Sequence, residues 1–149
     1  MQEIRLSASG IIFQHDKVLL VRYKDQKTDF LVGPGGGVFP EEDLYSGLKR
    51  EVLEETGLLV NPGRMLLVED LLASKYRVIK IWFLCTIVGG EITETEEARI
   101  EGIVDVNWYT RSQLENEIVY PEILKSVDWQ ELSNAIIETK YFPLKKANF

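Results

Sequence analysis

The sequence predicts an α/β protein in which helices cover both faces of a mixed β-sheet. Runs rich in β-branched and aromatic residues lie on both sides of one amphipathic segment around residue 48. A second helix is predicted near the C-terminus. Strands that flank a central helix, followed by another helix, are typical of a layered α/β/α sandwich.

The predicted strands begin with a hairpin. Residues 4–13 are mostly apolar or small, and residues 17–23 (KVLLVRY) form a second run after the polar turn QHD. A short strand follows over residues 30–32. We expect the segment 33–37 (GPGGG) to be a turn and not a regular element, because glycine allows unusual backbone angles and close approach. Further strands are predicted over residues 59–60, 64–72, 76–88 and 104–109.

The central helix is predicted to begin near Asp43 and to end at Gly57. Between Leu44 and Val52 an aliphatic residue recurs every four positions, which indicates one buried helix face. Gly47 lies inside this helix, where it costs about 1 kcal/mol relative to alanine. A close backbone contact with the sheet would explain it.

Two shorter helices are predicted after the last strand. Residues 112–117 suit a single short helix, and residues 128–139 suit a final one with Asp128 as its N-cap. The acidic stretch 91–101 (EITETEEARIE) between two predicted strands is expected to be a loop.

Length and composition predict one domain over residues 1–149. The 24 acidic residues outnumber the 17 basic ones, for a net charge of −7, which argues against a partner such as duplex nucleic acid. Anionic small molecules remain compatible if metal ions supply positive charge.

The chain also lacks signals for a membrane or an oxidising compartment. No apolar run approaches the roughly 20 residues needed to cross a bilayer. The N-terminus lacks the pattern of a signal peptide, and Cys85 is the single cysteine. We therefore expect a cytoplasmic location and no membrane partner.

Three glutamates crowd one face of the central helix. Glu51 lies three and four positions before Glu54 and Glu55, and like charges at this spacing destabilise a helix by a few tenths of a kcal/mol each. Hard divalent cations such as Mg²⁺ and Mn²⁺ prefer carboxylate oxygens and would remove this conflict. A solvated acidic face is the alternative. The glycine turn just before the helix favours a metal site, since its backbone can approach metal or phosphate closely.

The same stretch resembles the Nudix box, G-x5-E-x7-R-E-U-x-E-E-x-G-U, in which U is aliphatic. Every defined position is filled over 23 residues, which makes the match far more specific than a short phosphate-loop pattern. The residues are Gly36, Glu42, Arg50, Glu51, Val52, Glu54, Glu55, Gly57 and Leu58.

The resemblance implies the Nudix fold, an α/β/α sandwich around a mixed sheet. It also implies Mg²⁺-dependent hydrolysis of a nucleoside diphosphate linked to another group X, with nucleoside triphosphates and dinucleoside polyphosphates included. Glu51, Glu54 and Glu55 match the family's metal ligands, and Gly36 matches its backbone carbonyl ligand. Glu42 and Arg50 then have supporting roles.

The catalytic base is left open by the resemblance. In the family it is a glutamate of the box or one from a later loop. Here Glu101 lies about where relatives often place an additional acidic ligand or base. The other acids of that loop are Glu94, Glu96 and Glu97.

Substrate-binding residues are predicted less specifically. Arg22 stands where relatives often carry a phosphate-contacting arginine, and an ordinary exposed arginine is the equal alternative. Tyr76 lies eighteen residues after the box, a spacing that resembles the marker of diadenosine polyphosphate hydrolases. ADP-ribose hydrolases often have a proline where this chain has Ser74, which makes that subfamily a weaker match.

Two other functions compete with an active hydrolase. One is a Nudix-fold module that senses a nucleotide without turnover, although the intact set of box glutamates favours the enzyme. The other is an acidic interaction domain, which leaves the glycine turn unexplained. The oligomeric state is open, with a homodimer among the alternatives because many relatives are dimers.

Overall fold

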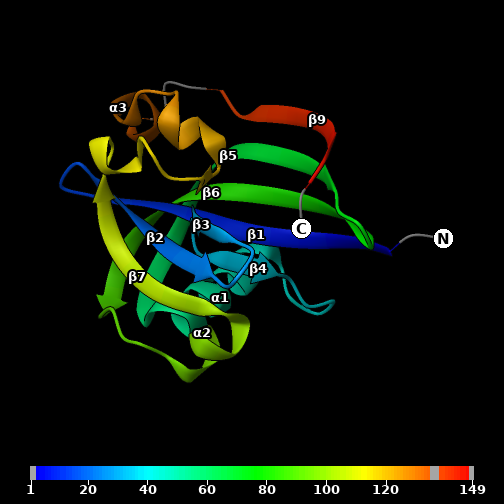
Figure 1. Ribbon diagram of the computed structural model, residues 1–149, viewed down its shortest axis with the longest axis horizontal. Coiled ribbons are helices and arrows are strands. Elements are labelled where there is room, and N and C mark those ends of the chain that lie inside the picture. The colour runs from blue at the N-terminus through cyan, green and yellow to red at the C-terminus, as the bar shows by residue number, and fades with distance from the viewer. Residues whose placement is uncertain (1–2, 135–137, 148–149) are drawn as a thin grey trace.

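A strongly curved mixed β-sheet forms the body of the molecule (Figure 1). The computed structural model describes residues 3–134 and 138–147, and nine strands join the sheet in this part of the chain. Seven follow the order β8-β3-β2-β1-β6-β5-β9, while β4 pairs with β1 and β7 pairs with β2. The strands are β1 (Glu3–Gln14), β2 (Lys17–Lys24), β3 (Asp29–Val32), β4 (Gly35–Gly37), β5 (Leu58–Leu72), β6 (Tyr76–Gly90), β7 (Ile103–Thr110), β8 (Val119–Tyr120) and β9 (Lys140–Lys146).

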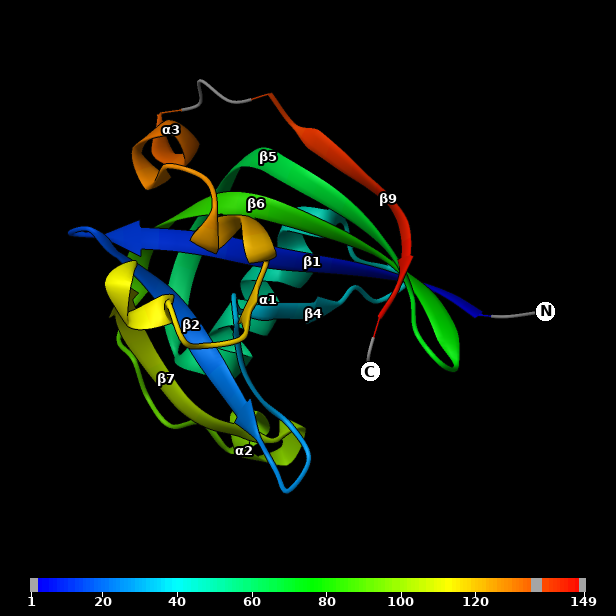
Figure 2. The same cartoon turned by 45° about the horizontal axis from the view of Figure 1, so that its top comes forward.

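Helices cover both faces of this sheet, as the α/β/α prediction requires. Helices α1 (Leu44–Thr56) and α2 (Glu96–Glu101) lie below it in Figure 1, and α3 (Trp129–Ser133) lies above it. Figure 2 shows the same layers after a 45° turn, with β9 passing along the edge next to β5. No helix within the described ranges has the length and apolar character needed to span a membrane.

The N-terminal hairpin is confirmed. Strands β1 and β2 pair antiparallel, with Gln14 opposite Lys17, and the two turn residues His15 and Asp16 have positive φ angles of 50° and 60°. Such angles match the twist of the flanking strands.

The glycine segment differs from the prediction. Residues Gly35–Gly37 form a short regular strand, β4, which pairs antiparallel with Ser7–Ser9 of β1. Glycine is required for this approach: a Cβ atom on Gly35, whose φ is 154°, would collide with the backbone of Ala8 and Ser9. The permissive backbone therefore allows tight strand pairing where a turn was expected.

Helix α1 agrees with its predicted bounds. Asp43 is the N-cap and accepts a hydrogen bond from the backbone N–H of Ser46 at 2.8 Å, while Gly57 ends the helix in the left-handed conformation, φ 83°. The reason for Gly47 is different from the predicted one. A Cβ atom there would lie 3.1 Å from the Val38 side chain. At Gly47 the helix therefore contacts the loop after β4 and not the backbone of the sheet.

Three other predictions need correction. The ranges 59–60 and 64–72 belong to one strand, β5, whose register shifts between Pro62 and Met65. The acidic stretch 91–101 contains α2 and is not all loop. The helix predicted over residues 112–117 is a 3₁₀ turn, Ser112–Leu114. A second 3₁₀ turn spans Glu122–Lys125.

The last predicted helix is shorter than expected. Asp128 is its N-cap, but α3 ends at Ser133, and residues 135–137 of the predicted range lie outside the described residues. Strand β9, which follows, was not predicted. All of its residues except Phe142 are exposed, and it includes Pro143, so the apolar alternation typical of a half-buried strand is missing.

The core has two parts, one on each face of the sheet. One part joins α1 to the sheet through Leu48 and Val52, which pack with Ile81 and Phe83 of β6. The other surrounds Trp82, which is fully buried with Ile11 and Leu67. Strand β6 therefore contributes side chains to both parts of the core.

Candidate active site

The site begins where β4 meets the C-terminal half of α1. Glu51 is buried and its carboxylate lies directly against the backbone of Gly36. A Cβ atom on Gly36 would lie 2.7 Å from the Glu51 carboxyl carbon, so a larger residue would displace this side chain. The glycine of the box therefore makes room for the first glutamate.

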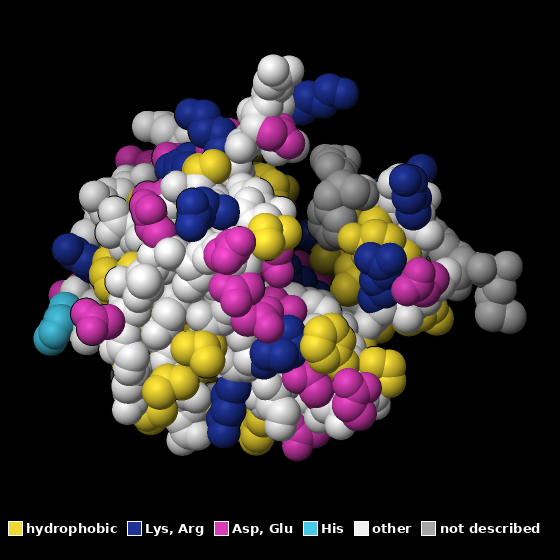
Figure 3. Space-filling model, turned by 90° about the horizontal axis from the view of Figure 1, so that it is seen from below, with side chains coloured by type: hydrophobic (Ala, Val, Ile, Leu, Met, Phe, Trp, Pro, Cys, Tyr) yellow, Lys and Arg dark blue, Asp and Glu magenta, His cyan; other side chains and the backbone are white. Residues whose placement is uncertain are grey.

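The structure brings three predicted site residues together from two helices. Glu51, Glu54 and Glu101 each offer a carboxylate oxygen, and these oxygens lie within 4.8 Å of one another. Burial raises the pKa of Glu51; the hydrogen bond from Arg50 lowers it, and the charges of Glu101 and Glu54 raise it further. Figure 3 shows acidic side chains gathered beside a hollow on the face seen from below Figure 1.

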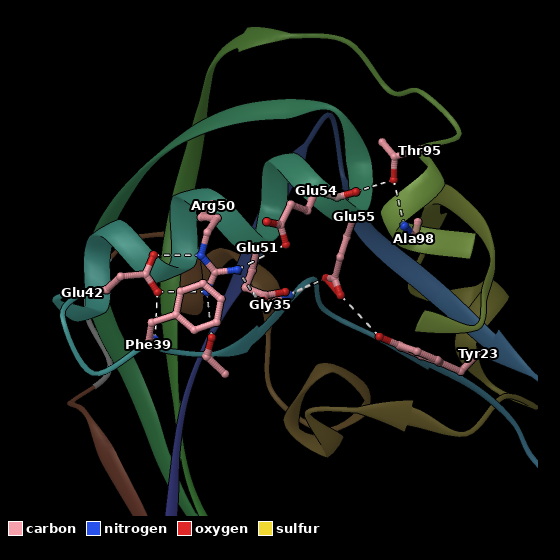
Figure 4. A network of polar contacts seen from close by, with 11 residues as sticks. Tyr23, Gly35, Phe39, Glu42, Arg50, Glu51, Glu54, Glu55, Thr95 and Ala98 are labelled. Atoms are coloured by element: carbon pink, nitrogen blue, oxygen red, sulfur yellow. Dashed lines mark hydrogen bonds and ion pairs between the residues drawn. The ribbon is translucent and has the colours of Figure 1, made fainter. Parts of the chain in front are cut away.

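Glu101 reaches this cluster because α2 is anchored to α1. The Thr95 hydroxyl caps α2 by accepting from the Ala98 N–H at 3.0 Å, and it also donates to the carbonyl oxygen of Glu54 (Figure 4). The role of Thr95 was not predicted. Its signal is visible in the sequence, since a threonine followed by Glu96 and Glu97 is typical of a helix N-terminus.

Glu55 lies outside this group of three carboxylates, but it is close enough to Glu101 and Glu51 for their charges to act on it. It is 1% exposed, and its carboxylate accepts hydrogen bonds from the Gly35 N–H at 2.7 Å and from the Tyr23 hydroxyl at 3.3 Å. Burial raises its pKa well above the ordinary value, and the charges of Glu101 and Glu51 add to this effect. The sequence did not predict that the main chain of β4 would hold this side chain.

Arg50 is the centre of the polar network in Figure 4. Its guanidinium donates two hydrogen bonds to Glu42, at 2.8 and 3.0 Å, and one each to Glu51 and Glu54, at 3.0 and 3.2 Å. A further bond at 2.9 Å reaches the Gly37 carbonyl, and the guanidinium lies 3.9 Å from the centre of the Phe39 ring. The network thus ties the loop before α1 to the helix.

Glu42 closes the same loop from the other side. Its carboxylate also accepts from the Phe39 N–H at 2.9 Å, and the hydrogen bond from Arg50 lowers its pKa. Glu42 lies outside the group of three carboxylates. The supporting role of Glu42 and Arg50 stays a prediction.

The donor set suits a hard divalent cation. The cluster offers carboxylate oxygens alone, without sulfur or imidazole, and such ligands favour Mg²⁺ or Mn²⁺ over softer metals. The predicted carbonyl ligand, that of Gly36, accepts a hydrogen bond from the Ser7 hydroxyl at 3.1 Å. A carbonyl oxygen has a second lone pair for a further partner.

The two predicted substrate residues lie in different surroundings. Arg22 forms ion pairs with Asp29 at 2.6 Å and with Glu117 at 2.8 Å, so its guanidinium is already matched by two carboxylates. Tyr76 begins β6 opposite Glu3 of β1, whereas Gly36 pairs with Ala8. Five residues of strand separate these rows by about 16 Å. Substrate binding by Arg22 and Tyr76 stays a prediction.

Two known proteins match most of this chain in sequence. The 8-oxo-dGDP phosphatase NUDT18 of Mus musculus is 30% identical over 118 residues, which are 77% of this chain and 35% of that protein. The ADP-ribose pyrophosphatase of Methanocaldococcus jannaschii is 28% identical over 124 residues, 80% of this chain and 73% of that one. This chain therefore spans about a third of the length of the NUDT18 relative.

A solved structure shows the same fold. The ADP-ribose pyrophosphatase from Streptococcus suis 89-1591 superposes with a TM-score of 0.66 at 24% identity, covering 92% of this chain and 98% of that one. A family model described as the NUDIX domain matches residues 3–130. The chain therefore belongs to the Nudix family, as the box between Gly36 and Leu58 predicts.

Proposed function

We propose that this protein is a Mg²⁺-dependent pyrophosphohydrolase that cleaves the diphosphate link of a nucleoside diphosphate derivative. The observation that carries the proposal is the group of Glu51, Glu54 and Glu101 carboxylates within 4.8 Å of one another. The names of the relatives, an 8-oxo-dGDP phosphatase and an ADP-ribose pyrophosphatase, support a nucleotide-type substrate with a phosphoric anhydride bond.

The metal ligands in this proposal are Glu51, Glu54 and Glu55 with the Gly36 carbonyl, and Glu101 is an additional ligand or the base. When bound, Mg²⁺ or Mn²⁺ neutralises negative charge on the phosphates and makes water at the site more acidic. Glu55 is pre-positioned by the Gly35 N–H and Glu101 by α2. Either carboxylate can take the proton of the attacking water in this arrangement.

In this proposal Arg50 positions the carboxylates before a cation binds. Its bonds to Glu51 and Glu54 offset their mutual repulsion, and those to Glu42 and Gly37 fix the loop. Carboxylates that are held in their bound geometry need no reorganisation when charge develops in the transition state.

A nucleotide panel tests the proposal. ADP-ribose, 8-oxo-dGDP, diadenosine tetraphosphate and the nucleoside triphosphates are incubated with the protein and Mg²⁺, Mn²⁺ or EDTA, and the products are separated by anion-exchange chromatography. We expect metal-dependent cleavage of at least one member, giving a nucleoside monophosphate or pyrophosphate. Tight binding without release across the panel would instead support a nucleotide sensor.

The panel also tests whether ADP-ribose is a substrate of this protein. The ADP-ribose relatives favour that substrate, whereas Ser74 in place of the usual proline predicts the opposite. One domain over residues 1–149, the cytoplasmic location and the homodimer stay predictions.

A further inference from the structure

Lys80 is a partly buried cation whose position in the sheet needs an explanation. It lies in the middle of β6, with Ser7 of β1 on one side and Glu69 of β5 on the other. Within residues 3–134 and 138–147 its ammonium group forms no hydrogen bond and no ion pair. Removing an ammonium from water costs free energy unless a partner compensates for the lost hydration.

The acids around Lys80 are already engaged by other donors. Glu69 is 8% exposed and accepts a hydrogen bond from the Trp82 indole N–H at 2.7 Å. Glu55 is bound by the Gly35 N–H and the Tyr23 hydroxyl. Burial lowers the pKa of Lys80, and the charges of Glu69 and Glu55 act in the opposite direction. Lys80 therefore lies within electrostatic reach of both Glu69 and Glu55, but among the described residues neither carboxylate forms a hydrogen bond or ion pair with its ammonium group.

Trp82 connects this lysine to the glycine strand. The Lys80 Nζ atom lies 4.7 Å from the centre of the Trp82 rings. The far edge of the indole packs on Gly33, where a Cβ atom would lie 2.6 Å from Trp82 Cζ3. Gly33 is two residues from Gly35, whose N–H holds Glu55. The ammonium thus lies over an indole ring that packs against Gly33, just before β4.

The arginines of the site do not offer free positive charge in the same way. Arg50 binds Glu42, Glu51 and Glu54. Arg22 binds Asp29 and Glu117. Ser7, which lies beside Lys80 in the sheet, donates a hydrogen bond at 3.1 Å to the Gly36 carbonyl, so the sheet register places Lys80 next to the predicted metal site.

We propose that Lys80 is a substrate-binding residue that contacts a phosphate oxygen of the nucleotide. This inference deepens the proposed function and rests on it. Phosphate supplies the missing partner of the ammonium, and the ammonium supplies positive charge on the side of the substrate away from the metal ligands of α1.

Steady-state kinetics of Lys80→Met and Lys80→Arg test this role on the best substrate of the panel. We expect Lys80→Met to raise KM about tenfold with a smaller change in kcat, because the variant loses a hydrogen bond between two charged groups. Lys80→Arg should stay closer to the unmodified protein. The matched control is Lys17→Met, which removes an exposed lysine from β2 at the hairpin. A KM of Lys80→Met within twofold of the unmodified protein would overturn the proposal.

Binding of ADP gives a readout that does not need turnover. Calorimetry with EDTA and with Mg²⁺ should show about tenfold weaker binding by Lys80→Met than by Lys17→Met. In the unmodified protein, ADP should slow acetylation of Lys80 several-fold and leave that of Lys17 unchanged, as read by mass spectrometry. Equal labelling rates, or no ADP binding in either buffer, would contradict the proposal. A panel without any hydrolysis would refute the proposed function alone, because binding and labelling test Lys80 independently.

Discussion

At Glu54 the negative charge can be removed without changing how α1 packs. Glu54 is half-buried, it accepts one hydrogen bond from Arg50 at 3.2 Å, and it belongs to the group of three close carboxylates. Glutamine keeps its size and its helix propensity but removes the negative charge. A change at Glu54 therefore alters a proposed metal ligand without altering the core.

We predict that Glu54→Gln and Glu55→Gln each lower Mg²⁺-dependent kcat/KM by about a hundredfold or more, since even indirect partners of metal ligands are worth roughly 10- to 100-fold. Steady-state kinetics with circular dichroism as the check of folding measure this. Glu97→Gln, an exposed change on α2, is the control and should stay near the unmodified rate. Unchanged kinetics in both test variants would refute the metal-site assignment.

The Cys85 thiol is expected to react slowly in the folded protein. The thiol is buried on β6, and burial raises its pKa to about 12. The thiolate is the reactive form, so we expect iodoacetamide to modify the folded protein at pH 8 at least about a hundredfold more slowly than the urea-unfolded protein. Mass spectrometry of timed samples measures the rates. Rapid labelling of the folded protein would show that the Cys85 region opens readily.

Helix α1 packs on the sheet through Leu48 and Val52, and it also contributes Glu51 and Glu54 to the proposed site. Its N-cap and C-cap are set by Asp43 and Gly57, and both could be predicted because capping depends on neighbouring residues. Helix α2 was missed for the opposite reason. It has six residues, too few for stability alone, and its Thr95 cap is tied to the Glu54 carbonyl.

The attachment of α1 can be tested with two leucines of the same helix. Leu48 is fully buried against the sheet, whereas Leu53 is 43% exposed. We predict that Leu48→Ala lowers the free energy of unfolding by about 2–5 kcal/mol, because it removes buried methyl groups and leaves a cavity. Leu53→Ala should cost about 1 kcal/mol or less. Urea unfolding followed by fluorescence measures both, and equal losses would contradict the observed packing.

At the scale of the whole molecule, the site depends on parts of the chain that are far apart in sequence. Gly36 from β4, Glu51 from α1 and Glu101 from α2 meet because β1 pairs with both β4 and β6, and because α1 packs on that sheet. A ligand that binds this folded arrangement and not the unfolded chain stabilises the fold by mass action.

We therefore predict that MgCl2 raises the melting temperature and that excess EDTA reverses the effect. A metal concentration ten times the Kd corresponds to about 1.4 kcal/mol of added stability. The shift should be smaller in Glu54→Gln than in Glu97→Gln, as measured by scanning calorimetry. NaCl at equal ionic strength controls for screening. Equal shifts in both variants and in NaCl would exclude a specific cation site at Glu54.

Features that rest on local spacing could be predicted from the sequence. The bounds of α1, the N-terminal hairpin and the box residues from Gly36 to Leu58 follow from periodicity, capping and motif, all of which act over a few residues. The grouping of Glu51 with Glu54 on one helix face belongs to the same class.

Pairings between residues far apart in sequence could not be predicted and are visible in the tertiary structure alone. Examples are the Arg22–Glu117 ion pair, the bond from the Gly35 N–H to Glu55, and the Lys80 ammonium above Trp82. Strand β9 belongs here too, because its mostly exposed residues become a strand by pairing with β5. The physical reason is that such contacts form when sheet register and helix docking bring side chains together, and neither is encoded within a short window of residues.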